Sequence, residues 1–184
     1  MPPTVKTITS SADLGTKIDL SRLADLIGNA QFSTGTGKHS RSLVVRLRNP
    51  RTTAQVYSSG VIHVNGAVTE PDAKIAARKV ARMIQKHGFD VGFKKYKIQT
   101  VIGYADLGYP LDVEELTTVH KQFASYEHEL NPAVIYKMVE PRVVLNIFPS
   151  GKLMINGARS VEDMFKAFEV IHPILKAHRR VKKD

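Results

Sequence analysis

The stretch NPRTTAQVYSSGVIHVNGA at residues 49–67 recurs 91 positions later as EPRVVLNIFPSGKLMINGA at residues 140–158. Each copy contains two runs rich in β-forming residues, and a turn that ends in Ser-Gly separates them. Such a pattern predicts a β-hairpin. The same hairpin is therefore expected twice in this chain.

A second landmark extends the repeat toward the N-terminus. Ala-Asp-Leu-Gly at residues 12–15 recurs at residues 105–108, here 93 positions later. The first copy must hold two extra residues between the landmarks, and the Gly/Ser/Thr-rich segment 33–40 is predicted to be the loop that contains them. Matched landmarks in one order indicate two structural repeats, predicted at residues 1–95 and 96–184.

Each repeat has the same predicted order of elements. A strand leads to a short helix, then three strands, then a closing helix. Asp19 or Ser21 is expected to cap the first short helix, and the closing helices are predicted from Glu70 to Lys86 and from Val161 to Lys176, with an interruption near Pro173. The predicted strands lie at 5–12, 42–48, 52–58 and 61–66 in the first repeat and at 97–105, 133–138, 142–148 and 152–156 in the second.

Alternation within the strands assigns their faces. In residues 142–148 the odd-numbered side chains are predicted to face the helices and the even-numbered ones the open side, and in residues 53–57 Ala54 and Val56 are predicted to point inward. The first closing helix is expected to bury a stripe of apolar residues. The stripe is Ile75, Ala76, Val80, Met83 and Ile84. The pattern predicts an α+β fold whose antiparallel sheet is covered by helices on one face only.

Composition narrows the function. The net charge is +10, which favours a polyanionic partner, although a solvated basic surface is the alternative. The chain has no cysteine, no apolar run long enough for a membrane span, and no N-terminal pattern of a secretory signal. It also lacks the His-Glu-x-x-His, paired-cysteine and Gly-x-Ser-x-Gly motifs. We therefore expect no enzyme activity, no cofactor, no metal and no membrane partner.

Several longer strings carry a family resemblance that covers residues 5–180. They are RLRNPRTTA (46–54), AARKVAR (76–82), QKHGF (85–89), KIQT (97–100), SYEHELNP (125–132) and PRVVLNIF (141–148). All of them, in this order, resemble the core of the TATA-box-binding protein family. The chain is thereby identified as a member of that family, as a divergent TATA-box-binding-protein-related factor.

The resemblance implies a pseudo-two-fold saddle, in which a long curved antiparallel sheet grips the DNA minor groove and helices cover the convex face. TATA-box-binding proteins are themselves the standard example of minor-groove kinking by apolar wedges. The family inserts four phenylalanines between base steps, and the matching positions here are Ser40, Tyr57, Asn131 and Phe148. Only Phe148 is unchanged. We therefore expect a weakened or altered preference for TATA elements.

The polar residues that face the bases in the family also differ. The family has an asparagine near the start of each repeat, where Thr7 and Thr100 stand here, and a threonine late in each repeat, where Asn65 and Asn156 stand. Threonine and asparagine still offer donors and acceptors that distinguish A·T from G·C in the minor groove.

The floor of the implied DNA-binding face is more polar than in the family. The positions at which the family has Val or Leu hold Thr9, Gln55, His63 and Asn146, while Ile102 and Met154 stay apolar. Polar floor residues without partners are costly to desolvate, about 1–3 kcal/mol each. This difference is a second reason to expect altered DNA preference.

Charged residues match family positions on other surfaces. Phosphate contacts that carry no sequence information are implied for Arg46, Arg51, Lys137, Arg142 and Lys152. Docking of transcription factor IIB is implied for Glu127, Glu129 and Leu130. A convex partner surface is implied for Lys74, Arg78, Lys79, Arg82 and Lys86. The segment 33–40 departs from the family, which leaves a contact with transcription factor IIA open.

The resemblance thus implies a nuclear transcription initiation factor that binds promoter DNA and docks basal factors. Three alternatives stay open. The first alternative is an authentic TATA-box-binding protein of a divergent eukaryote. The second is a regulator that works through protein contacts without specific DNA binding. The third is an enzyme domain with the same fold, such as part of a DNA glycosylase. The missing phenylalanines argue against the first, and the lack of catalytic groups argues against the last. Self-association through the open face is a further expectation.

Overall fold

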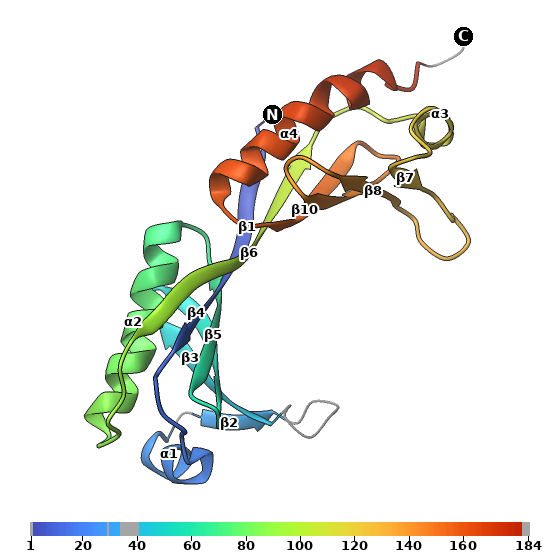
Figure 1. Ribbon diagram of the computed structural model, residues 1–184. Coiled ribbons are helices and arrows are strands. Elements are labelled where there is room, and N and C mark those ends of the chain that lie inside the picture. Colours follow the sequence, from blue (N-terminus) through green and yellow to red (C-terminus); the bar gives the residue numbers. More distant parts are fainter. Residues whose placement is uncertain (1, 29, 34–40, 182–184) are drawn as a thin grey trace. The chain divides into compact units, whose positions relative to one another are not determined.

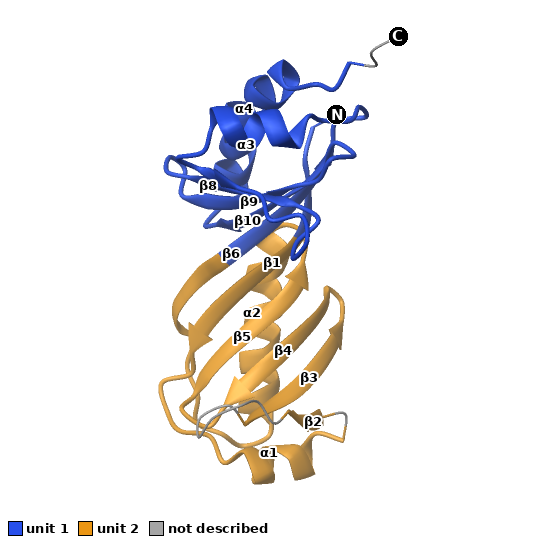
Figure 2. Cartoon of the chain, turned by 90° about the vertical axis from the view of Figure 1, so that its right-hand side faces the viewer, with its two compact units in different colours: residues 1–6, 100–184 blue, residues 7–99 orange. Residues whose placement is uncertain are grey.

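The computed structural model describes residues 2–28, 30–33 and 41–181 (Figure 1). The chain forms two compact units, which we call the N-unit (residues 7–99) and the C-unit (residues 1–6 and 100–184) (Figure 2). In the N-unit the strands are ordered β2-β3-β4-β5-β1-β6, and in the C-unit they are ordered β6-β10-β9-β8-β7. The long strand β6 therefore contributes one half to each unit.

The elements of the N-unit are β1 (Thr4–Asp13, of which residues 4–6 belong to the C-unit), α1 (Leu20–Leu26), β2 (Ala30–Ser33), β3 (Ser42–Arg48), β4 (Arg51–Tyr57), β5 (Val61–Ala67), α2 (Glu70–Lys86) and the first half of β6 (Lys94–Asp106). The elements of the C-unit are the rest of β6, α3 (Val113–Val119), β7 (Ala124–Ser125), β8 (Val134–Met138), β9 (Val143–Ile147), β10 (Lys152–Ala158) and α4 (Val161–Ala177). The strand pairings within each unit are antiparallel.

The repeated Asp-Leu-Gly forms a corner at the end of β1. The carboxylate of Asp13 accepts a 2.8 Å hydrogen bond from the Gly15 amide, and the Leu14 amide donates to the Gly60 carbonyl at 2.8 Å. Gly60 has φ +93°, and a Cβ there would lie 2.1 Å from the carbonyl oxygen of Thr16. Only glycine fits this turn, because both the left-handed backbone and the close approach exclude a side chain.

The C-unit repeats the corner at the end of β6. Asp106 accepts from the Gly108 amide at 2.9 Å, and the Leu107 amide donates to Gly151 at 3.0 Å. Gly151 has φ +94°, and its Cβ would lie 2.0 Å from the Tyr109 carbonyl oxygen. The Asp-Leu-Gly landmark and the Ser-Gly landmark of each repeat therefore contact each other. In the N-unit the β4–β5 turn packs on the segment that follows β1. In the C-unit the β9–β10 turn packs on the segment that follows β6.

Helix α2 covers one face of the N-unit sheet and packs on β5 (Figure 1). Its predicted bounds are confirmed, and Thr69 caps it by accepting from the Asp72 amide at 3.2 Å. Its buried residues are Ala73, Ala76, Ala77, Val80, Ala81 and Ile84. The predicted stripe was wrong at Ile75, which is 46% exposed. Small alanines, not Ile75, allow the helix to lie close to the sheet.

Helix α4 covers one face of the C-unit sheet and packs on β10. The predicted interruption at Pro173 is wrong, since the helix continues to Ala177. Pro173 removes one helical hydrogen bond near the C-terminal end. Ile171 and Leu175 on either side of it are fully buried, and this packing holds the last turn.

Two short edge strands were not predicted. β2 pairs with β3, and β7 pairs with β8. They have four and two residues, too few for alternation to be visible in the sequence. The predicted α+β class is confirmed, because each unit has an antiparallel sheet with helices on one face and the other face uncovered by any described helix (Figures 1 and 2).

Candidate nucleic-acid interface

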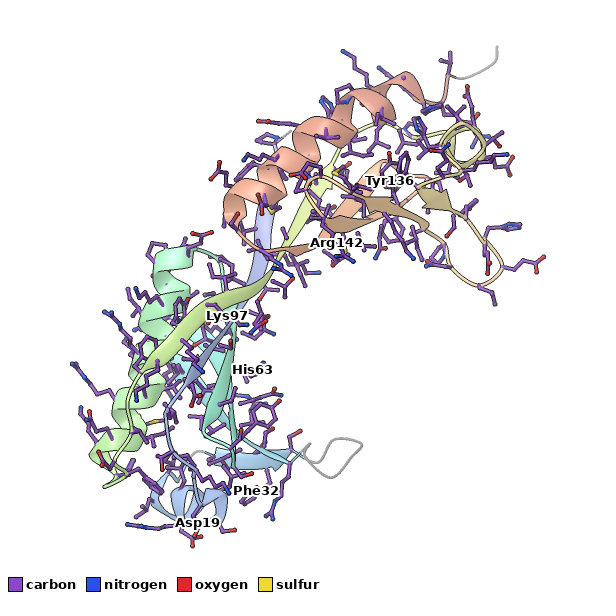
Figure 3. The ribbon with its side chains drawn as sticks, viewed as in Figure 1. Asp19, Phe32, His63, Lys97, Tyr136 and Arg142 are labelled. Carbon is purple, nitrogen blue, oxygen red and sulfur yellow. The ribbon has the colours of Figure 1, made fainter. Side chains whose placement is uncertain are left out.

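The N-unit sheet has an open face on the side away from α2. In β4 and β5 every second side chain is buried under the helix, as predicted for Ala54 and Val56, and the alternate ones point to the open side. We call this set the N-face: Thr7, Thr9, Thr53, Gln55, Tyr57, His63 and Asn65. Figure 3 shows His63 projecting from β5 on that side.

Tyr57, Gln55 and His63 form one cluster on the N-face. The Tyr57 hydroxyl donates to the side-chain oxygen of Gln55 at 3.0 Å, and the Tyr57 ring meets the His63 ring edge-on at 5.4 Å. Gln55 and His63 face each other across β4 and β5. Partial burial lowers the pKa of His63, so its imidazole is neutral at neutral pH. Tyr57, which occupies one of the wedge positions, is thus hydrogen-bonded to a side chain of its own strand.

Asn65 is held by two hydroxyl groups. Ile8 pairs with Ala67 and Thr9 with Asn65, so Gly66 is an extra residue in β5, and this register shift places both Thr7 and Thr9 beside Asn65. Thr7 donates to the amide oxygen of Asn65 at 2.8 Å, and Thr9 donates to the same oxygen at 3.0 Å. The amide oxygen is therefore occupied, and the amide nitrogen keeps two N–H donors for an outside acceptor.

The C-unit sheet has a corresponding open face away from α4. We call it the C-face: Thr100, Ile102, Val144, Asn146, Phe148, Met154 and Asn156. Met154 faces Asn146 across β10 and β9, as His63 faces Gln55 in the N-unit. The predicted alternation is confirmed here, since Val143, Leu145 and Ile147 are buried.

Basic side chains lie at the same edge of each open face. In the N-unit Arg46 and Arg51 are exposed and line a hollow of about 590 Å³ together with Thr53 and Asn65. In the C-unit Lys137 and Arg142 are exposed and line a hollow of about 1160 Å³ with Val144 and Asn156 (Figure 3). Lys152 is exposed at the start of β10. Each half thus places cations beside its asparagine.

The sequence reasoning missed two cations and named two face residues only through alternation. Arg48 lines the N-unit hollow at the end of β3, and Arg159 lines the C-unit hollow, although it follows β10 and carries no motif. Thr53 and Val144 lie on the faces because they alternate with buried neighbours, so their positions were predictable but their role was not.

The other two wedge positions are Ser40 and Asn131. Ser40 lies outside the described residues. Asn131 is half-buried, and its side-chain oxygen accepts a 3.0 Å hydrogen bond from the Ala133 amide. This bond uses Asn131 to hold the turn before β8, which leaves Phe148 as the one phenyl group among the described wedge positions.

The turn at 127–130 projects two carboxylates and one apolar side chain. Glu127 and Glu129 are exposed, and Leu130 is 83% exposed. The Glu127 carbonyl accepts hydrogen bonds from the amides of Leu130 and Asn131, at 2.9 and 2.8 Å, which fixes the turn. An apolar side chain held out among carboxylates is suited to contact a protein with a basic rim.

The five basic residues of α2 are all exposed, on the side of the N-unit opposite the N-face. Some also bind within the unit. Lys79 donates to the carbonyl of Asn49, Arg78 lies 5.7 Å from the Phe93 ring, and Lys74 lies 5.9 Å from the Tyr96 ring. Lys74, Arg78 and Lys79 are therefore positioned by contacts with Tyr96 of β6, with Phe93 just before it and with the β3–β4 turn, while Arg82 and Lys86 extend the row along the helix.

Metal-binding groups and membrane-spanning helices were also sought among the described residues. Within residues 2–28, 30–33 and 41–181, His, Asp and Glu side chains do not gather in any group that would hold a metal ion. Among the described helices, none has the length and apolar character needed to cross a bilayer.

Comparison with known proteins gives one consistent result. The family model for "Transcription factor TFIID (or TATA-binding protein, TBP)" matches residues 2–87 and 95–178. The chain is 43% identical to the TATA-box-binding protein of Artemia franciscana over 97% of this chain and 64% of that protein. It is likewise 43% identical to the TATA-box-binding protein of Xenopus tropicalis, over 97% of this chain and 59% of that one.

A solved structure confirms the fold. The chain matches Methanococcus jannaschii TBP with a TM-score of 0.80 and 29% identity, over 97% of this chain and 100% of that one. The chain spans 57 to 66% of the length of the curated relatives it matches. A family of transcription factors agrees with the expectation of a non-enzymatic protein, and two matched segments agree with the internal repeat. The chain therefore belongs to the TATA-binding protein family.

Proposed function

We propose that this chain is a nuclear transcription initiation factor that binds promoter DNA in the minor groove with a weakened or altered preference for TATA elements. The observation that supports this most directly is the matched arrangement on the two open faces. Each presents an asparagine beside exposed cations, Asn65 with Arg46 and Arg51, and Asn156 with Lys137 and Arg142. Cations bind phosphates and the amide groups face the base edges.

The altered preference follows from the content of the faces. Tyr57 bonds to Gln55, and Asn131 bonds to its own turn, so two of the positions that would wedge base steps are engaged elsewhere. Strong kinking depends on apolar wedges that unstack base pairs. A face with one described phenyl group is therefore expected to bind with less bending, and TATA steps, which are easily kinked, lose their advantage.

The test is selection from a random duplex library, followed by affinity measurements against salt for the selected duplexes and for a TATA duplex. We expect selected sequences to bind at least as tightly as the TATA duplex. A nanomolar complex that forms selectively with TATA at physiological salt would overturn the altered preference and favour an authentic TATA-box-binding protein. The absence of binding to any duplex would favour a regulator that works through protein contacts.

We further propose that the turn at 127–130 docks transcription factor IIB, with Glu127, Glu129 and Leu130 as the contacts. Removing the exposed Leu130 side chain should weaken a central apolar contact, so Leu130→Ala is expected to lower the affinity for purified factor IIB at least tenfold. Val119→Ala is the matched control, because Val119 is an apolar side chain 59% exposed elsewhere in the C-unit. Equal losses in both variants would refute the assignment.

A further inference from the structure

The two open faces differ systematically at equivalent positions. The N-face residue is polar and its C-face counterpart apolar in four pairs: Thr9 and Ile102, Thr53 and Val144, Tyr57 and Phe148, His63 and Met154. Gln55 and its counterpart Asn146 are both amides. The backbone pairing is the same in both units, so the difference lies in the side chains alone.

The exocyclic amino group of guanine is the DNA group toward which the two faces should behave differently. In the minor groove both A·T orientations present acceptors only, and a G·C pair adds the N2 amino donor. An apolar protein surface pressed on that donor leaves it without a partner. A surface with free acceptors satisfies it.

The N-face contains such acceptors. Thr9 donates its hydroxyl proton to Asn65, so its oxygen faces outside groups as an acceptor. Gln55 accepts one bond from Tyr57 and keeps a second lone pair. His63 is half-exposed between them, and its neutral ring carries one acceptor nitrogen.

The C-face offers fewer acceptors to an amino group. Ile102 and Val144 are aliphatic, Phe148 is a phenyl ring, and the Met154 sulfur is a weak acceptor. The strong acceptors near Met154 are the amide of Asn146 and the hydroxyl of Tyr104, its two cross-strand partners. The apolar side chains make good van der Waals contact with an A·T groove, which lacks the amino group.

Resting on the proposed minor-groove binding, we propose that the N-face accepts G·C base pairs, whereas the C-face requires A·T base pairs. Thr9, Gln55 and His63 are the residues that determine the difference. The chain then recognises an asymmetric site, A·T-only on one side and mixed on the other, and this asymmetry orients it on DNA.

The test compares guanine with inosine, which lacks only the N2 amino group. Each position of a selected duplex is made G·C or I·C, and Kd is measured for both. The orientation of the protein on the duplex is determined with a DNA-cleaving reagent attached at position 139 of the Val139→Cys variant. Val139 is 71% exposed in the C-unit, and the chain has no native cysteine. We expect a G·C to I·C ratio of Kd near one, and below about threefold, where the N-face lies, and about tenfold or more where the C-face lies.

Exchange of face residues between the repeats gives the matched variants. The double variant Thr9→Ile with His63→Met is expected to raise the N-face ratio to about tenfold, and the reciprocal Ile102→Thr with Met154→His to lower the C-face ratio by several-fold. Affinity for the I·C duplex in each variant verifies that the protein is folded and bound. If neither exchange moves its ratio, the assignment to these residues is wrong.

The outcomes separate the two proposals. Equal ratios on both halves, with tight binding to I·C duplexes, would overturn this inference and leave minor-groove binding intact. Failure to bind any duplex, inosine-containing ones included, would overturn the proposed DNA binding and this inference with it.

Discussion

Removal of one face cation from each unit tests where DNA lies on this protein. Arg51 and Arg142 occupy equivalent positions, both are exposed, and each lines the hollow beside its asparagine. With the five cations assigned to phosphates, the slope of log K against log salt should be about −4.5, because each phosphate contact contributes about −0.9. Arg51→Ala and Arg142→Ala should each make the slope about 0.9 less negative, and the double variant about 1.8.

The slopes translate into affinities that are easy to measure. Between 50 and 200 mM salt the unmodified chain should lose affinity about 500-fold, and the double variant only about 40-fold. The assay is fluorescence anisotropy of a labelled duplex over that range, with the fold monitored by thermal unfolding.

The control for net charge is Arg82→Ala. Arg82 is an exposed arginine on α2, on the other side of the N-unit from the N-face. Its loss changes the total charge by the same amount and should change the slope by less than about 0.3, since it contacts no phosphate. If Arg82→Ala flattens the slope as much as Arg51→Ala does, the cations act through long-range charge alone and the proposed placement of DNA on the open faces is refuted.

Two further predictions concern the scaffold and the face. Gly108→Ala should lower the free energy of unfolding by about 1–3 kcal/mol, since Gly108 has φ +78° but no atom within 4 Å of the added Cβ. Gly151→Ala should lower it by more, because the added Cβ would also meet the Tyr109 carbonyl. Urea unfolding measures both against Gly28→Ala, which has open space and an ordinary φ; equal losses at 108 and 151 would refute the contact. Because the folded pKa of His63 lies below its unfolded value of 6.5, the unfolded chain takes up this proton first, and stability should fall as pH drops through 6.5. His63→Met should flatten that slope in unfolding measured from pH 7.5 to 5; an unchanged slope would contradict the burial of His63.

The hairpins were predictable because their signals are local. Alternation in β4, β5 and β9 and the Ser-Gly turns identified strands and faces, and caps such as Asp19 were identifiable from residue type. The errors were at Ile75, which is exposed because small alanines of α2 face the sheet instead, and at Pro173, where the buried packing of Ile171 and Leu175 outweighs the low helix propensity of proline.

The side-chain contacts within the N-face could not be predicted from the sequence. The shared bond from Thr7 and Thr9 to Asn65 depends on a register shift at Gly66 of β5, and a glycine inside a strand indicates a bulge but not which side chains it brings together. The bond from Tyr57 to Gln55 depends on the rotamer of an exposed ring. Family resemblance and alternation indicated which positions lie on the face, but which polar atoms are already hydrogen-bonded depends on the tertiary structure.

The two repeats agree where the backbone demands it and differ where it does not. The Asp13 and Asp106 corners and the glycines at 60 and 151 coincide, because each makes the same backbone contact and no other residue type fits. Side chains on the open faces carry no such constraint, since they are half-exposed and outside the core of their unit. The backbone contacts of the corners therefore do not account for the differences between the N-face and the C-face. We infer that the differences reflect what each face contacts, and for that reason the exchange of face residues between repeats, with the corners left intact, is the experiment that separates scaffold from recognition.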